Sequence, residues 1–128
     1  MHIEHVAIWC HDLERMRTFY TSAFTAECGP RYTNARGFHS YFLRLQGECR
    51  LELMQRADVV AGEDDKTREW LGLAHIAFRV GSREAVDAMT TALQQAGCRC
   101  LSGPRVTGDG YYESCLFDPE NNRIELCA

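Results

Sequence analysis

The sequence contains an internal repeat, and this repeat constrains the fold more than any other feature. The segment IEHVAI and the later segment LAHIAF each place a histidine before an apolar residue, an alanine and a second apolar residue. The two histidines, His5 and His75, lie 70 residues apart. Each is followed by a polar turn and an amphipathic stretch, so the sequence predicts two modules of the same design.

An amphipathic helix is expected after each histidine strand. The first covers 12–24, where apolar residues recur on one face and Asp12 is a suitable N-cap. The second begins after Ser82, again an N-cap type, and ends at Gly97, where a left-handed residue is favoured.

The last predicted strands of the two modules are also similar in sequence. RLELM in the first module resembles RIELC in the second, and places Glu52 and Glu125 73 residues apart. Further strands are expected at 31–34, 41–46 and 49–55, then at 98–102, 111–117 and 123–127. Loops are expected at 29–37, 57–72 and 102–110. Each module is therefore predicted to be a strand, a helix and two or three strands.

Length and composition favour one globular domain. The chain has 128 residues, of which 45% are hydrophobic and 25% charged, which excludes a disordered, collagen-like or coiled-coil chain. Within the domain we expect module one at 1–56, a linker at 57–72 and module two at 73–128.

Charge and cysteine content restrict the partners and the compartment. The net charge of −4 gives no general attraction to phosphate backbones, so no nucleic-acid partner is expected. No apolar run approaches the length of a membrane span, so no membrane partner is expected. The cysteine count of 7 is odd, and the start of the chain lacks the basic and apolar regions of a secretory signal. These features favour reduced thiols and a cytoplasmic location.

Four side chains of the repeat form the candidate site. Side chains alternate along a strand, so the bulky apolar residues pack under the helix and the His and Glu side chains lie on the other face. If a two-fold axis relates the modules, four residues converge on it: His5, Glu52, His75 and Glu125. Taken singly, each is also explained as a hydrogen-bonded or solvated strand residue. Two imidazoles and two carboxylates together suit a divalent ion such as iron, cobalt, nickel, manganese or zinc.

The sequence resembles the vicinal oxygen chelate superfamily, which includes glyoxalase I, methylmalonyl-CoA epimerase, extradiol dioxygenases and bleomycin resistance proteins. The resemblance covers nearly the whole chain and rests on IEHVAI with DLERMRTFY, on LAHIAFRV and on FDPENNRIEL, where Asn121 replaces the family's usual Gly. It implies an α+β fold of two βαβββ modules, related by a pseudo-two-fold axis and forming a curved sheet around a metal cavity.

The order His, Glu, His, Glu is most similar to that of bacterial glyoxalase I. This resemblance implies that His5, Glu52, His75 and Glu125 bind one divalent ion (Ni, Co, Zn, Mn or Fe). It also implies that Glu125 is the catalytic base, with Glu52 as its repeat counterpart. The implied enzyme is a carbon–sulfur lyase, similar to lactoylglutathione lyase. It isomerises the hemithioacetal of a 2-oxoaldehyde and a thiol by carboxylate-mediated proton transfer. A small-molecule substrate and a homodimer are implied as partners.

The sequence departs from glutathione-dependent glyoxalases at two positions. Those enzymes carry arginines for the glutathione carboxylates where this chain has Trp9 and Leu71. The identity of the substrate therefore stays open, and the candidates are a hemithioacetal of another thiol, a CoA thioester or a different chelating molecule. So do three alternative functions: a methylmalonyl-CoA epimerase, which typically has Gln where this chain has Glu52, a small-molecule binding or resistance protein, and a ring-cleaving dioxygenase. The modules pair either within one chain or between two.

Overall fold

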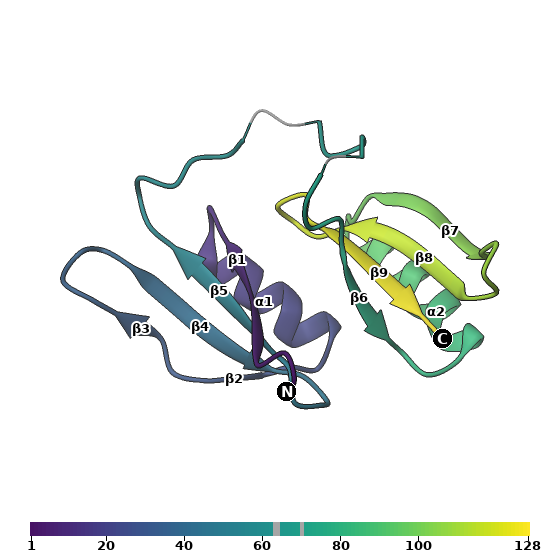
Figure 1. Ribbon diagram of the computed structural model, residues 1–128, viewed down its shortest axis with the longest axis horizontal. Helices are drawn as coiled ribbons and strands as arrows, with labels where there is room; N and C mark the ends of the chain where they lie inside the picture. Colours follow the sequence, from purple (N-terminus) through teal and green to yellow (C-terminus); the bar gives the residue numbers. More distant parts are fainter. Residues whose placement is uncertain (63–64, 70) are drawn as a thin grey trace. The chain divides into compact units, whose positions relative to one another are not determined.

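The computed structural model describes residues 1–62, 65–69 and 71–128. The chain divides into two compact units, Met1–Glu63 and Asp64–Ala128, and each unit has one helix and its own sheet in the described residues (Figure 1). The predicted α+β class is confirmed. Residues 63, 64 and 70 of the predicted linker 57–72 lie outside the described residues. The arrangement of the two modules around a common axis and cavity stays a prediction.

The first unit is a sheet with one helix on it. Its elements are β1 (His5–Trp9), α1 (Leu13–Ala23), β2 (Glu27–Cys28), β3 (Tyr32–Thr33), β4 (His39–Arg44) and β5 (Arg50–Gln55). The strand order is β1-β5-β4-β2, and β3 also pairs with β4. Strand β1 runs parallel to β5, and the other pairs are antiparallel.

The second unit has the element order βαβββ. Its elements are β6 (Ile76–Arg79), α2 (Arg83–Gln95), β7 (Cys100–Val106), β8 (Tyr112–Phe117) and β9 (Arg123–Cys127). The strand order is β6-β9-β8-β7, with β6 parallel to β9. The first unit has this same order with one additional short strand, so the repeat in the sequence is also a repeat of structure.

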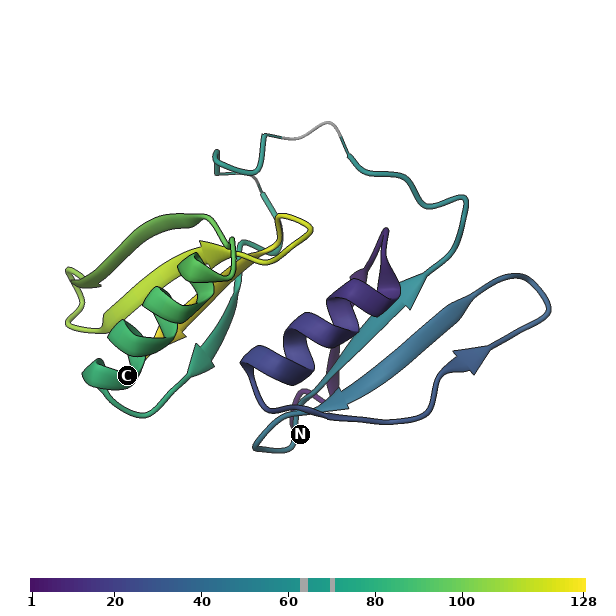
Figure 2. The same ribbon diagram turned by 180° about the vertical axis from the view of Figure 1, so that it is seen from behind.

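Each helix covers one face of its own sheet (Figure 2). Thr90 of α2 is buried and shares a hydrogen bond of 2.6 Å with Ser114 Oγ of β8. The buried apolar side chains of the two helices lie at apolar positions that the sequence predicts, over buried apolar side chains of the strands. These are Leu13, Met16, Tyr20, Leu43, Leu51 and Leu53 in the first unit, and Val86, Leu93, Leu116, Ile124 and Leu126 in the second. Because neighbours along a strand point to opposite faces, the residues between these apolar positions lie on the face without a helix.

The predicted helix ends are confirmed. The Asp12 side chain accepts a hydrogen bond from the Arg15 backbone N–H at 3.0 Å, and the Ser82 Oγ accepts one from the Ala85 backbone N–H at 3.2 Å. Gly97, after α2, has a φ of +94°, the left-handed conformation in which glycine is favoured.

The predicted loop at 102–110 is wrong in its first half, because β7 continues to Val106. The register against β8 shifts on both sides of Ser102, which is a bulged pairing. Gly103 has a φ of +85°, and a Cβ there would lie 2.5 Å from the Glu113 carbonyl oxygen. Gly103-Pro104 therefore marks a bulge in an edge strand, where both residue types are tolerated, and does not end the strand. The short strand β2 was not predicted.

No helix in the described part of the chain is both long enough and apolar enough to span a membrane.

Replacing Glu14 by glutamine is expected to weaken the first unit. Glu14 accepts hydrogen bonds from Arg17 Nε at 2.9 Å, the Tyr41 hydroxyl at 2.8 Å and Arg31 Nη1 at 3.4 Å. The Arg17 hydrogen bond, followed by that of Tyr41, lowers the pKa of Glu14 from its ordinary value of 4.5. A lowered carboxyl pKa stabilises the fold above the ordinary value, and this contribution is lost as the pH falls through the folded value.

We expect Glu14→Gln to lower the free energy of unfolding by about 0.5–1 kcal/mol at pH 7, a modest loss because water screens this half-exposed group. Urea unfolding of both proteins from pH 7 to pH 3 measures the difference, which should shrink toward acid pH. If the difference in the free energy of unfolding stayed constant with pH, the charge of the Glu14 carboxylate would not be the cause of the stabilisation.

Candidate metal centre

The first unit brings His5 and Glu52 together on the sheet face without a helix. His5 begins β1, and Ala7, two residues later on the same face, pairs with Glu52 of β5. His5 Nε2 lies 3.8 Å from Glu52 Oε2. The His5 side chain is 41% exposed, whereas that of Glu52 is 14% exposed.

The second unit repeats this arrangement with His75 and Glu125. Ala77, two residues after His75, pairs with Glu125 of β9. His75 Nε2 lies 3.7 Å from Glu125 Oε2, and the two side chains are 42% and 16% exposed. The two pairs therefore agree in register, separation and exposure, as expected if both serve the same purpose, although His75 lies one residue before the start of β6.

The separation of the paired atoms fits two ligands of one metal ion. At 3.7–3.8 Å the nitrogen and oxygen are too far apart for a normal hydrogen bond. Ligands that each lie about 2.0–2.2 Å from an ion such as zinc are about 3–4 Å from one another. The donor set of each pair, one imidazole nitrogen and one carboxylate oxygen, is therefore suited to a divalent ion.

Each pair is only half of the predicted ligand set. Over residues 1–62, 65–69 and 71–128, no group of three or more His, Cys, Asp or Glu within one unit is arranged to hold a metal ion. The structure thus joins His5 to Glu52 and His75 to Glu125, and the convergence of the two pairs stays a prediction.

Glu4 contacts the candidate ligand His5, and the repeat does not reveal this contact. Its carboxylate hydrogen-bonds His5 Nδ1 and also pairs with Arg50. The hydrogen bond from His5, followed by that from Arg50, lowers the pKa of Glu4. A carboxylate on Nδ1 holds the proton there and leaves a lone pair on Nε2, the nitrogen that faces Glu52. The residue before His75 is Ala74, so this support does not repeat and comparison of the modules could not reveal it.

Glu113 on β8 distinguishes Glu125 from Glu52. Burial, followed by the charge of Glu125, raises the pKa of Glu113. Arg105 Nη2 lies 3.7 Å from Glu113 Oε1 and acts in the opposite direction. Ser40 stands at the matching position of the first module, so Glu113 also escaped detection by repeat comparison.

Comparison with known proteins assigns the family. Residues 2–126 match the model of the Glyoxalase/Bleomycin resistance protein/Dioxygenase superfamily. The uncharacterized protein YqjT of Bacillus subtilis (strain 168) is 30% identical over 129 residues, which cover 98% of each chain.

Solved structures share the fold. A glyoxylase/bleomycin resistance protein/dioxygenase domain from Frankia sp. EAN1pec aligns with a TM-score of 0.82 at 20% identity, covering 99% of this chain and 96% of that one. Lactoylglutathione lyase from Agrobacterium tumefaciens aligns with a TM-score of 0.68 at 21% identity, covering 98% and 92%. The resemblance seen in the sequence is confirmed, and this chain belongs to the Glyoxalase/Bleomycin resistance protein/Dioxygenase superfamily.

Proposed function

We propose that the protein is a divalent-metal-dependent lyase of the glyoxalase I type. Its reaction converts the hemithioacetal of a 2-oxoaldehyde and a thiol into a 2-hydroxyacyl thioester. The observation that carries this proposal is the matched geometry of the two His–Glu pairs, 3.8 Å and 3.7 Å between nitrogen and oxygen. The fold shared with a lactoylglutathione lyase supports it.

The proposed ligands are His5, Glu52, His75 and Glu125. A divalent ion bound by them supplies a Lewis acid that polarises the substrate oxygens. The nickel, cobalt, zinc, manganese and iron ions all accept this mixture of imidazole and carboxylate ligands. Glu4 holds His5 in the tautomer that ligation requires.

The chemical step is a proton transfer between neighbouring carbons. The Glu125 carboxylate removes the proton from the carbon that bears the sulfur, and returns it to the adjacent carbon, which was the ketone. The hydroxyl proton of the first carbon passes to the former ketone oxygen, so the first carbon becomes the thioester carbonyl and the second becomes the hydroxyl-bearing carbon. No oxidant or reductant is consumed. Glu125 is favoured over Glu52 for this step because the carboxyl group of Glu113 lies near it and Glu52 has no such neighbour in its own sheet.

The test is turnover of methylglyoxal by protein loaded separately with each of the five ions. Glutathione, cysteine, coenzyme A and 3-mercaptopropionate are supplied as thiols, and thioester formation is followed by ultraviolet absorbance and NMR. We expect thioester with at least one ion and one thiol, and none after chelation. Metal binding without thioester from any thiol would overturn the lyase proposal and favour the epimerase or the binding protein.

A further inference from the structure

Arg123, the first residue of β9, is largely buried and binds the segment 66–69 of the linker. Its side chain is 10% exposed. Nε donates a hydrogen bond to the Lys66 carbonyl oxygen at 3.0 Å, and Nη1 donates one to the Glu69 carboxylate at 2.6 Å. Nη2 donates to the Arg68 carbonyl oxygen. All three guanidinium nitrogens are therefore engaged, as a buried charge requires, and we refer to these three hydrogen bonds as the linker contact.

The segment that Arg123 binds is itself a compact turn. Asp65 Oδ1 accepts hydrogen bonds from the Thr67 backbone N–H at 2.9 Å and from Thr67 Oγ1 at 2.6 Å. The Arg68 backbone N–H donates to the Asp65 carbonyl oxygen at 3.0 Å. Because the turn has its own hydrogen bonds, one side chain that binds it at three points fixes the whole segment.

The register of the sheet places Arg123 beside His75. The paired part of β6 and β9 begins with Ile76 opposite Ile124. One residue earlier on each strand, His75 stands at the level of Arg123. Arg123 and Glu125 are two residues apart on β9, so they share the sheet face without a helix. The linker contact therefore lies at the end of the sheet where both candidate ligands of this unit are found.

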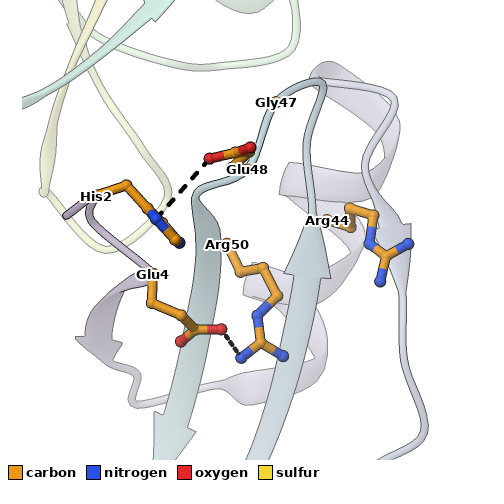
Figure 3. Close-up of a pocket in the computed structure, with 6 residues that line it drawn as sticks. All are labelled: His2, Glu4, Arg44, Gly47, Glu48 and Arg50. Carbon is orange, nitrogen blue, oxygen red and sulfur yellow. Dashed lines mark hydrogen bonds and ion pairs between the residues drawn. The ribbon is translucent and has the colours of Figure 1, made fainter.

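The first unit holds its histidine in a different way. His5 lies inside the paired part of β1, opposite Arg50, and Glu4 hydrogen-bonds both side chains. Figure 3 shows the contact between Glu4 and Arg50. Arg50 is the repeat counterpart of Arg123. In each unit, therefore, the arginine that begins the last strand binds the segment in front of the histidine.

His75 lacks both of the supports that His5 has. It precedes β6 and so stands outside the paired part of that strand, and Ala74 before it has no polar side chain to hold the ring. A metal ligand must be held in position, and residues that hold ligands typically contribute 10–100-fold to metal affinity. The linker contact restrains the chain at Glu69, six residues ahead of His75.

Stability of the fold is a weak explanation for the linker contact. A buried ion pair is often no more stabilising than apolar residues of similar size, and the Glu69 side chain is 80% exposed. Two of the three acceptors are backbone carbonyl oxygens, at Lys66 and Arg68. Bonds to the backbone fix the path of the chain, so the arrangement specifies where the linker runs before it enters β6.

We propose that Arg123 is a positioning residue of the candidate metal centre. Its linker contact fastens segment 66–69 to the start of β9 and so holds His75 at the separation of 3.7 Å from Glu125 that a shared ion requires. The inference rests on the proposed function, because it needs these two residues as metal ligands.

The first experiment tests the linker contact in the metal-free protein. Trypsin cleaves after lysine and arginine, so Lys66 and Arg68 provide two cleavage sites inside the segment, and mass spectrometry identifies the products. We expect Arg123→Ala to raise the rate of cleavage at both sites about tenfold, because proteolysis follows local opening. Cleavage after Arg36, in an exposed turn of the first unit, should not change. Equal rates at all sites in the two proteins would overturn the proposal.

The second experiment tests the position of His75. NMR measures the order parameter of its backbone amide in metal-free protein, and competition with a chromophoric chelator measures the zinc affinity of the folded protein. We expect the order parameter to fall from about 0.85 to below about 0.6 in Arg123→Ala. Zinc affinity should fall about 10–100-fold. Arg123→Lys keeps the charge but not the planar set of donors, and should give intermediate values.

Arg83→Ala is the matched control. Arg83 is an exposed arginine at the start of α2, on the opposite face of the same sheet, so its loss changes the net charge equally. It should leave the order parameter and the zinc affinity unchanged. Glu69→Gln keeps both carbonyl contacts of Arg123 and should lower zinc affinity less than about threefold.

The outcomes separate this role from the lyase proposal. Unchanged order parameter and zinc affinity in Arg123→Ala would overturn the positioning role, even if trypsin cleaved the linker faster. An equal fall in zinc affinity in Arg83→Ala would assign the effect to net charge and overturn it as well. If the wild-type protein bound metal but formed no thioester, the lyase proposal would fall and the role of Arg123 would stand. If it bound no divalent ion, both would fall.

Discussion

Glu125→Gln is expected to lower the turnover number of the metal-loaded protein by about 10²–10⁴-fold, the usual contribution of a general base. The glutamine carbonyl oxygen is still able to bind a metal ion, but it cannot accept the proton. Metal content should therefore fall much less than turnover. Thioester formation and elemental analysis of the same samples measure the two quantities.

Glu52→Gln is the matched control for this variant, because Glu52 has the same strand position and a similar distance to its histidine. We expect a smaller loss of turnover, since no carboxyl group equivalent to Glu113 supports Glu52. If Glu125→Gln lost metal and activity in equal measure, Glu125 would be a ligand only. A greater loss of turnover in Glu52→Gln would reverse the two roles.

Metal binding is expected to stabilise the folded protein. A ligand at a hundredfold excess over its dissociation constant raises the free energy of unfolding by about 2.7 kcal/mol. His5→Ala and His75→Ala should each lose most of this increment, because each leaves its unit with one ligand of the pair. Urea unfolding with and without each divalent ion measures the increment.

His39→Ala provides the control for histidine replacement. His39 Nδ1 hydrogen-bonds Thr33 Oγ1 at 2.9 Å and has no counterpart in the repeat, so its loss should leave the metal increment unchanged. If none of the five ions stabilised the wild-type protein, the four residues would be hydrogen-bonded or solvated strand residues. The small-molecule binding protein would then be the leading hypothesis.

The parts of the fold that local sequence determines were predictable. Asp12 and Ser82 cap α1 and α2 through their own side chains, so both helix starts could be identified from a few residues. Strand β2 has two residues and exists only through its pairing with β4, and the bulge in β7 likewise depends on β8. Such features depend on residues distant in sequence and leave no periodic pattern.

The candidate site was predictable to the extent that it repeats. His5 and Glu52 appear a second time as His75 and Glu125, and strand alternation alone assigns each pair to the face opposite the helix. Glu4 and Glu113 have no counterpart in the other module. The contacts of Glu4 with Arg50 and of Glu113 with Arg105 bring together segments distant in sequence, which the repeat alone does not reveal.

The division of the ligands into two equal pairs has a consequence for affinity. If the proposed ligands bind an ion, each pair alone is a bidentate chelator, and strong binding depends on the effective concentration of one pair near the other. If both pairs come from one chain, substitutions in segment 57–72 should change metal affinity without touching a ligand. If they come from two chains, metal affinity should fall when the protein is diluted. Metal titrations at two protein concentrations therefore report whether the two modules that share an ion belong to one chain or to two.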